Sequence, residues 1–169
     1  LGPDGGCVAR YAKVQLAGEK WCLSGKRLVV FPIDDVLATV IICHDERYPE
    51  LVRLPVLAGA QLVFYISCES GVIEETKVDP YRAQIVARAE ENTVFVVHAN
   101  TPQVSHRNSD GTITLEGGCS HGQSRIIAPD GNLMQEASIF QEEMLVQSLD
   151  MSKAHRHIAL RSVESDLLA

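Results

Sequence analysis

The sequence is poor in several features that would each indicate a class of protein. Lysine and arginine number 15 against 22 acidic residues, which gives a formal net charge of -7, and no basic run could follow a phosphate backbone. We therefore expect no nucleic acid partner. The longest apolar stretches, such as Val36–Cys43, are much shorter than a membrane-spanning helix requires. We also expect no membrane partner.

Motifs for metals and phosphates are missing as well. The five cysteines form no C-x-x-C pair, and the six histidines form no H-E-x-x-H motif, so we predict no metal. No Gly-Lys-Ser/Thr follows the glycines near Gly122, which excludes a phosphate loop. His98 lies in an apolar run and is expected to be a core histidine. An odd number of unpaired cysteines favours reduced thiols and a cytoplasmic location.

Hydrophobic residues make up 46% of the 169 residues, so we expect one buried core and a single domain over residues 1–169. Two segments have helical spacing, one from Pro49 to Leu57 and one that opens at Pro80 and runs to Asn92. Apolar runs rich in branched residues predict strands. These strands are Leu28–Phe31, Val36–Ile42, Gln61–Ile66, Val94–Ala99, Ser124–Ala128 and Met144–Leu149.

The order of these elements indicates an α/β fold. From Val36 to Ala99 the pattern is strand, helix, strand, helix, strand, which favours parallel neighbours. The stretch Pro129–Asn132 is typical of a hairpin turn, so the later strands should run antiparallel and the sheet should be mixed. Residues Thr101 to Cys119 have the composition of one long loop.

Cys43 ends the apolar strand Val-Ile-Ile-Cys and is followed at once by the polar residues His44 and Asp45. This pattern predicts a nucleophile elbow, in which a tight strand-to-helix turn lifts a side chain above the sheet edge. The N-terminus of the following helix is expected to lower the pKa of the thiol. A lone cysteine is more often a small buried residue, so the surrounding sequence must decide between the two interpretations.

A series of segments is similar, in order and spacing, to the nitrilase or carbon–nitrogen hydrolase superfamily. The likeness extends from about Tyr11 to Arg161, and it is specific because several pieces occur in the right order. The pieces are Tyr11–Leu16, Gly18–Trp21 with Gly25, Ile42–Arg53, Ala58–Ala60, Arg88–Asn92 with Val94–Val97 and Ala99–Asn100, and Gly122–Arg125 with Pro129–Gly131. On this resemblance, residues 1–169 are a partial carbon–nitrogen hydrolase domain.

The resemblance implies a four-layer αββα sandwich and a Glu-Lys-Cys triad. By position, Cys43 matches the nucleophile. Lys13 matches the lysine that holds the tetrahedral oxyanion with the backbone N–H of His44, and Glu19 matches an additional acid beside that lysine. An activated nucleophile and a fixed positive charge suit acyl transfer. The implied reaction is hydrolysis of a small amide, carbamoyl or nitrile compound, without a cofactor, in a homodimer or larger homo-oligomer.

Three departures from the family pattern affect this prediction. The general-base glutamate of the family lies well before the lysine, and the only acid ahead of Lys13 is Asp4, at the wrong distance. We therefore expect the base to be absent from this sequence, and an inactive module with a role in assembly or binding is the alternative function. Gln15 replaces a frequent histidine, and Pro55 should kink or restart the elbow helix. A thiol redox sensor is a third hypothesis.

Four residues are candidates for substrate binding: His44, Glu46, Arg47 and Glu69. Glu46 and Glu69 follow predicted strands, where open α/β sheets place ligands, although solvated loop acids are the alternative. Arg47 could bind a substrate carboxylate or pair with Glu50 on the same helix. With a net charge of -7, the two acids favour a neutral or cationic amine-bearing substrate over a dianionic one.

Overall fold

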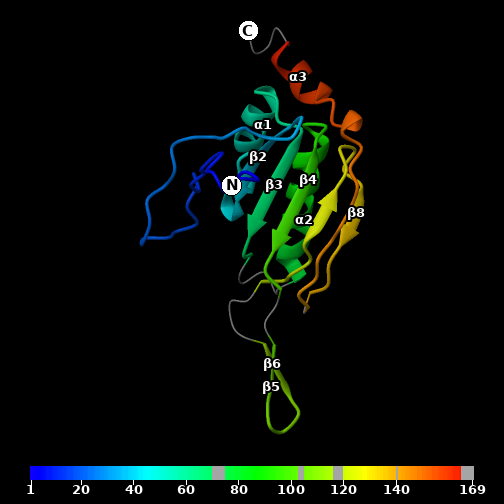
Figure 1. Cartoon of the computed structure of the whole chain (residues 1–169). Coiled ribbons are helices and arrows are strands. Elements are labelled where there is room, and N and C mark those ends of the chain that lie inside the picture. The colour runs from blue at the N-terminus through cyan, green and yellow to red at the C-terminus, as the bar shows by residue number, and fades with distance from the viewer. Residues whose placement is uncertain (70–74, 103–104, 116–119, 140, 165–169) are drawn as a thin grey trace.

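The computed structural model describes residues 1–69, 75–102, 105–115, 120–139 and 141–164 (Figure 1). Its helices are η1 (Cys43–Arg47), α1 (Glu50–Leu57), α2 (Glu75–Glu90), η2 (Met151–Lys153) and α3 (His157–Val163), of which η1 and η2 are short 3-10 helices. Its strands are β1 (Phe31–Ile33), β2 (Val36–Ile42), β3 (Leu62–Ser67), β4 (Phe95–Asn100), β5 (Ser105–Arg107), β6 (Ile113–Leu115), β7 (Arg125–Ile127) and β8 (Leu133–Glu136). No helix in these ranges is long and apolar enough to cross a membrane.

The strands form one mixed sheet of six, in the order β1-β2-β3-β4-β7-β8, and a separate hairpin of β5 and β6 that extends from one end of it (Figure 1). β2, β3 and β4 run parallel because α1 and α2 connect them, whereas β1, β7 and β8 pair antiparallel. The turn between β7 and β8 closes through two 2.9 Å hydrogen bonds, from the Ala128 N–H to the Asn132 carbonyl oxygen and from the Gly131 N–H to the Ala128 carbonyl oxygen. The predicted α/β fold, mixed sheet and Pro129–Asn132 hairpin are confirmed.

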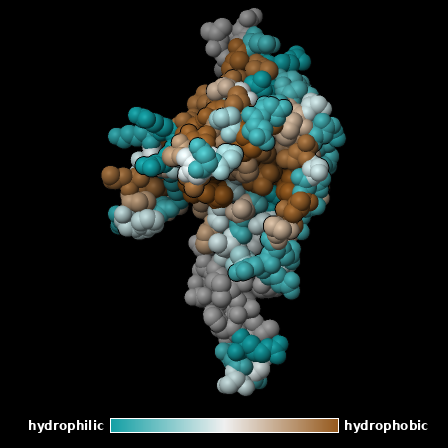
Figure 2. All heavy atoms as spheres, in the orientation of Figure 1, coloured by the Kyte–Doolittle hydropathy of each residue, from teal (hydrophilic) through white to brown (hydrophobic). Residues whose placement is uncertain are grey.

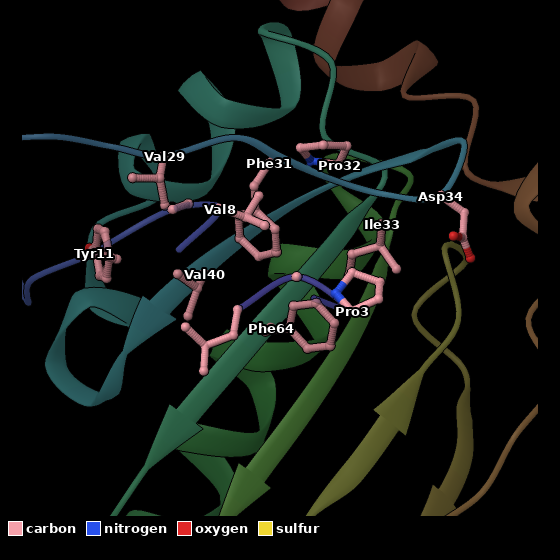
Figure 3. A pocket seen from close by; sticks show the side chains of 13 residues that line it. Pro3, Val8, Tyr11, Val29, Phe31, Pro32, Ile33, Asp34, Val40 and Phe64 are labelled. Carbon is pink, nitrogen blue, oxygen red and sulfur yellow. The ribbon is translucent and has the colours of Figure 1, made fainter. Parts of the chain in front are cut away.

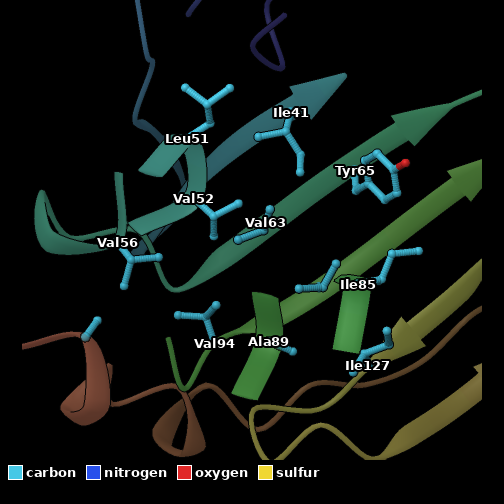
Figure 4. Packing of buried hydrophobic residues seen from close by; sticks show 12 residues of the cluster. Ile41, Leu51, Val52, Val56, Val63, Tyr65, Ile85, Ala89, Val94 and Ile127 are labelled. Atoms are coloured by element: carbon cyan, nitrogen blue, oxygen red, sulfur yellow. The ribbon is translucent and has the colours of Figure 1, made fainter. Parts of the chain in front are cut away.

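One face of the sheet is covered by α1 and α2, and α3 contacts α1 (Figure 1). Along β3 the side chains alternate, so that Val63 and Tyr65 point to the helices while Leu62 and Phe64 point away. Val52 and Val56 of α1 are fully buried against this face (Figure 4). Burial of each such aliphatic side chain stabilises the fold by roughly 1.5–3 kcal/mol.

The opposite face of the sheet carries a second apolar cluster that α1 and α2 do not cover. Leu62 and Phe95 are buried there beside Ala154, which lies in the segment after β8. Ile66, on the same face, remains 44% exposed. Figure 2 shows hydrophobic side chains gathered on this face of the molecule. The described residues thus form helices packed on one sheet, and the second half of the predicted four-layer sandwich is not found among them.

Several elements differ from the sequence prediction. α2 begins at Glu75, before Pro80, and α1 continues through Pro55. Each proline is the sixth residue of its helix, where it removes one backbone hydrogen bond without ending the helix. The predicted strand at Met144–Leu149 is wrong, and β8 takes its place as the partner of β7. β1 lies slightly later than predicted, and the long loop contains β5 and β6.

Candidate active site

The carboxyl ends of the three parallel strands meet at one edge of the sheet. Ile42 of β2 lies beside Ile66 of β3, and Ser67 of β3 lies beside Asn100 of β4. Cys43 follows Ile42 directly, so its side chain leaves the sheet at the edge where open α/β sheets place ligands. The candidate site is therefore assembled by strand register from segments far apart in the sequence.

Cys43 has the strained backbone that a nucleophile elbow requires. Its φ is 50°, in the left-handed region that residues with a side chain rarely adopt. It is the first residue of η1, and α1 begins only at Glu50. The prediction of a tight turn at Cys43 is confirmed, but a short 3-10 helix stands where a regular helix was expected.

Asp45 fastens the N-terminal segment to this turn. Its carboxylate is fully buried and accepts hydrogen bonds from four donors. The Ile42 N–H at 3.1 Å belongs to the turn itself, whereas the Tyr11 hydroxyl at 2.8 Å and the N–H groups of Val14 and Gln15 at 3.2 and 2.7 Å belong to the N-terminal segment. Residues 1–30 form no helix or strand, so this side chain is a main attachment of the segment to the sheet.

Lys13 lies in the attached segment and is directed by Glu19. The Lys13 ammonium donates to the Glu19 carboxylate, and their side chains are 14% and 24% exposed. This hydrogen bond lowers the pKa of Glu19. The Gly25 N–H donates to the Lys13 carbonyl oxygen at 2.7 Å, and a Cβ at Gly25 would lie 2.1 Å from the Ala12 oxygen. Only glycine permits this close approach behind the lysine.

The environment of the Cys43 sulfur raises the pKa of the thiol. Burial is the largest cause, and the negative charge of Glu69 acts in the same direction. The Lys13 charge and the N–H groups of Cys68 and His44 oppose it without reversing the result. The predicted lowering by a helix N-terminus is therefore wrong, because η1 is too short to outweigh burial. The thiol keeps its proton at neutral pH until a base removes it.

Glu46 and Glu69 are buried, so the interpretation of either as a solvated loop acid is wrong. Glu46 is 1% exposed, and its oxygens have no hydrogen-bond partner in the described part of the chain. Burial, together with the nearby charge of Glu69, raises the pKa of Glu46 to about 8. Glu69 is 3% exposed. Burial works to raise its pKa, but hydrogen bonds from His121 and Tyr65 outweigh it, and the net change is downward.

Arg47 and His44 each contact a tyrosine instead of a carboxylate. Arg47 is exposed and donates to the Tyr81 hydroxyl of α2 at 2.7 Å, with its guanidinium 5.0 Å from the centre of the Tyr81 ring. The predicted pairing of Arg47 with Glu50 is therefore replaced by a contact between η1 and α2. The His44 ring packs edge-on against Tyr48, and burial followed by the Arg47 charge lowers its pKa.

A cavity of about 640 Å³ lies between the N-terminal segment and the open face of the sheet (Figure 3). Its walls are mainly apolar and include Val8, Val29, Phe31 and Phe64. Cys43 is not among the lining residues, so this cavity is a gap beside the sheet and not the candidate catalytic pocket. Within the described ranges, no three His, Cys, Asp or Glu side chains are arranged to hold a metal ion.

Residues 1–157 match the sequence profile of the family described as carbon-nitrogen hydrolase. The chain belongs to the carbon-nitrogen hydrolase family. A curated relative, the 2-oxoglutaramate amidase of Bacillus subtilis (strain 168), is 31% identical over 149 residues, which cover 86% of this chain and 51% of that protein. The family predicted from the order of sequence segments is thus confirmed. The chain spans about half the length of the curated relatives it matches.

Two solved structures of the nitrilase superfamily have the same fold as this carbon-nitrogen hydrolase chain. Nit3 of Saccharomyces cerevisiae matches with a TM-score of 0.68 at 26% identity, over 82% of this chain and 47% of that chain. A mutant of the amidase from Nesterenkonia sp. AN1 matches with a TM-score of 0.63 at 27% identity, over 77% and 46% of the two chains. That mutant shows covalent addition of the acetamide moiety of fluoroacetamide at its active site cysteine.

The structure brings most of the predicted site residues together. The charges of Lys13 and Glu69 shift the pKa of the Cys43 thiol, and the charge of Glu69 raises the pKa of Glu46. Glu19 forms an ion pair with Lys13. Their catalytic and substrate-binding roles remain predictions. Sequence analysis missed Asp45 and His121. Asp45 lies two residues after Cys43, in the Ile42–Arg53 segment that is similar to the family, but nothing in the sequence shows which distant segment its carboxylate binds.

Proposed function

We propose that the protein containing this chain hydrolyses a non-peptide carbon–nitrogen bond of a small amide, carbamoyl or nitrile compound, with Cys43 as nucleophile. The observation that carries the proposal is the strained Cys43 turn with the Lys13 charge acting on its sulfur. A nucleophile at a strand-end turn beside a fixed cation suits acyl transfer, because negative charge develops on the substrate oxygen as the sulfur attacks. No cofactor is required for this chemistry.

For an amide substrate the proposed reaction has two stages. A base takes the Cys43 proton, the sulfur bonds to the carbonyl carbon, and the oxygen becomes an oxyanion beside Lys13 and the N–H of His44. The carbon–nitrogen bond then breaks, the departing nitrogen takes the proton, and ammonia or an amine leaves a thioester on Cys43. Water attacks the thioester, which releases the acid and returns a proton to the sulfur. Glu19 keeps the Lys13 ammonium in place through both stages.

The proposed substrate is neutral or cationic rather than carboxylated. Arg47, the cation that could favour a carboxylate, is engaged with Tyr81. Glu69 contributes a negative charge near the sulfur, which would repel an anionic substrate. A panel of carbamoylated amines and carbamoylated amino acids, assayed for ammonia release, tests this preference. Faster turnover of the carboxylated set, lost on Arg47→Ala, would reverse it.

We propose that the whole protein contains a second sheet, which completes the four-layer sandwich, and that it forms a homodimer. The open face of the sheet carries apolar residues, including Phe64 and the 44% exposed Ile66, as expected for a face that packs on a second sheet in a four-layer αββα arrangement. The resemblance to the nitrilase superfamily supports a homodimer packed through the elbow helix and the C-terminal segment. Light scattering of the full-length protein at micromolar concentration should therefore show a species of at least twice the monomer mass.

An inactive module acting in assembly or binding is the second candidate. It is favoured by the raised pKa of the Cys43 thiol, which leaves the sulfur protonated and unreactive unless a base acts on it. Such a module would keep its fold and its assembly without turning over any amide.

The deciding experiment compares Cys43→Ala with Cys7→Ala in the full-length protein. Cys7 is an exposed free thiol, so its replacement controls for the loss of a sulfur. Ammonia release from a panel of small amides should be abolished by Cys43→Ala and kept by Cys7→Ala, while circular dichroism shows both variants folded. Equal activity of the two variants would exclude Cys43 as the nucleophile, and no activity in the unmodified protein would favour the inactive module.

A further inference from the structure

A buried polar cluster lies at the ends of β3 and β4, and Glu69 is its centre. The Glu69 carboxylate accepts a hydrogen bond from the Tyr65 hydroxyl at 2.7 Å and another from the His121 Nε2. Its own backbone N–H donates to the Asn100 Oδ1 at 3.2 Å. The side chain is 1% exposed. A residue whose carboxylate accepts two hydrogen bonds and whose backbone donates a third is fixed in place, and its charge is not a surface charge.

The hydrogen bonds of Ser67 extend the cluster. The Ser67 hydroxyl gives its single proton to the Asn100 Oδ1 at 2.9 Å, so the His98 Nε2 at 2.8 Å must donate to the Ser67 oxygen. Burial lowers the pKa of His98 to about 4, which agrees with a neutral ring that carries its proton on Nε2. The same Asn100 oxygen therefore binds both Ser67 and Glu69, the residues on either side of Cys68.

Cys68 connects this cluster to the candidate nucleophile, because Ile42 and Ile66 are register partners and the residues that follow them leave the sheet side by side at one edge. Its backbone N–H acts on the Cys43 sulfur and lowers the pKa of the thiol, while the charge of Glu69 raises it. The Cys68 N–H has little freedom, because the residues before and after it are both bonded to Asn100. The cluster thus presents two opposing influences to one sulfur, a main-chain donor and a negative charge.

We propose that Glu69, held by His121, Tyr65 and Asn100, is a positioning residue for Cys43: the cluster fixes the Cys68 N–H against the sulfur and sets the negative charge that faces it. The proposal deepens the proposed function, since it concerns the same sulfur. In the reaction, the charge keeps the thiol protonated until a base acts, and the fixed N–H then stabilises the thiolate. Neither influence requires Glu69 to touch the substrate.

Several other charged or titratable groups surround the site, and the charge of Glu69 also acts on Glu46, His98 and Arg125. Lys13 lies on the N-terminal side, Glu46 and His44 lie on η1, and the Arg88 Nε of α2 donates to the Glu46 carbonyl oxygen at 2.9 Å. The Arg125 guanidinium of β7 is 3.1 Å from the Glu136 carboxylate. Asn100→Ala and Glu50→Gln leave Glu69 and these groups in place, whereas Glu69→Gln also removes the charge that raises the pKa of Glu46. Together, the two consequences of Glu69→Gln reduce negative charge near the sulfur or leave it unchanged.

Two substitutions separate the charge from the positioning. Glu69→Gln removes the charge but keeps an oxygen that accepts from the Tyr65 hydroxyl, and the new amide can still pair with the His121 ring. Asn100→Ala keeps every charge but removes the oxygen that binds both neighbours of Cys68. Glu50→Gln is the matched control, because Glu50 is an exposed acid at the start of α1 and is not among the partners of Glu69 or Cys43 described above. If Asn100→Ala does not fold, Ser67→Ala loosens the same turn.

The measurement is the pH dependence of Cys43 alkylation by iodoacetamide in the full-length protein, followed by mass spectrometry of the Cys43 peptide. We expect Glu69→Gln to move the midpoint down by about one pH unit and Asn100→Ala to move it up by a smaller amount. Glu50→Gln should leave it unchanged. For turnover, Asn100→Ala should lower kcat with little change in KM.

Opposite shifts would not result from general loss of structure. An unchanged or raised midpoint in Glu69→Gln would contradict the claim that the Glu69 charge raises the pKa of the Cys43 thiol. An unchanged or lowered midpoint in Asn100→Ala would contradict the claim that Asn100 holds the Cys68 N–H against the sulfur. Alkylation reports on the sulfur whether or not the protein cleaves an amide. Failure of the proposed function would appear as full activity in Cys43→Ala. The shifts in the alkylation midpoint are independent of that result, so the two failures can be told apart.

Discussion

The two sides of Cys43 are built in different ways. The positive side consists of Lys13 and Glu19 on a segment without helix or strand, and the buried carboxylate of Asp45 binds that segment to the sheet. The negative side consists of Glu69 and its partners, which the parallel register of β3 and β4 places at the sheet edge. The comparison shows that a regular scaffold can position one half of a site while a few hydrogen bonds position the other.

This difference makes the positive side easier to detach by a single substitution. Asp45 alone receives three of the bonds from the N-terminal segment, whereas Glu69 is supported by side chains from three elements or loops. The expected effects therefore decrease from Asp45, through Lys13, to the buried acid Glu46.

Asp45→Ala should have the largest effect. It leaves the Ile42, Val14 and Gln15 N–H groups without their buried acceptor, so we expect the free energy of unfolding to fall by roughly 3–5 kcal/mol. Activity should be lost with it, since Lys13 is no longer held beside Cys43. Urea unfolding of the full-length protein measures the change. Asp35→Ala, at an exposed aspartate, is the control, and equal stability of the two variants would show that Asp45 does not fasten the segment.

Lys13→Ala should leave the fold intact but lower kcat by at least about 100-fold, the loss typical of one donor to an oxyanion. KM should change less, because the charge matters most when the oxyanion forms. The pKa of the Cys43 thiol should also rise, since the Lys13 charge lowers it. Lys20→Ala removes the same charge from an exposed lysine nearby and should leave kcat and the pKa of the thiol nearly unchanged. Unaltered kcat in Lys13→Ala would show that Lys13 has no part in the reaction.

Glu46→Gln should change how stability depends on pH. The pKa of Glu46 is raised from 4.5 to about 8, so the folded protein binds a proton that the unfolded chain has released across this window. The stabilising contribution of Glu46 is complete below pH 4.5 and is lost as the pH rises through about 8. Its replacement by a neutral amide should flatten the fall in unfolding free energy by at most about 1.4 kcal/mol per pH unit. Parallel stability curves for the two proteins would contradict the buried, proton-bearing Glu46.

The regular half of the site could be predicted from the sequence because its signals are local. The apolar runs before Cys43 and before Asn100 mark β2 and β4, and a parallel arrangement brings their ends to one edge. The hairpin at Pro129–Asn132 was likewise predictable from turn chemistry, although its second strand was placed too late along the chain.

The other half depends on contacts that no local pattern encodes. Nothing near Asp45 shows that its carboxylate binds residues 11 to 15, and nothing near Glu69 shows that His121, 52 residues later, will donate to it. The two glutamates looked like loop acids because they follow strands, and their burial arises from packing between distant segments. The direction of the Cys43 pKa was mispredicted for the same reason, since burial decides it and burial is a tertiary property.

The most direct test of the account is to trap the covalent intermediate. The full-length protein is mixed with a small amide that it turns over, quenched in acid within the steady state, digested and mapped by mass spectrometry. The account predicts the acyl group on the peptide that contains Cys43, in greater amount when hydrolysis of the thioester is slowed. Acyl transfer to another residue, or turnover in a Cys43→Ala protein with no acyl group on any peptide, would contradict it.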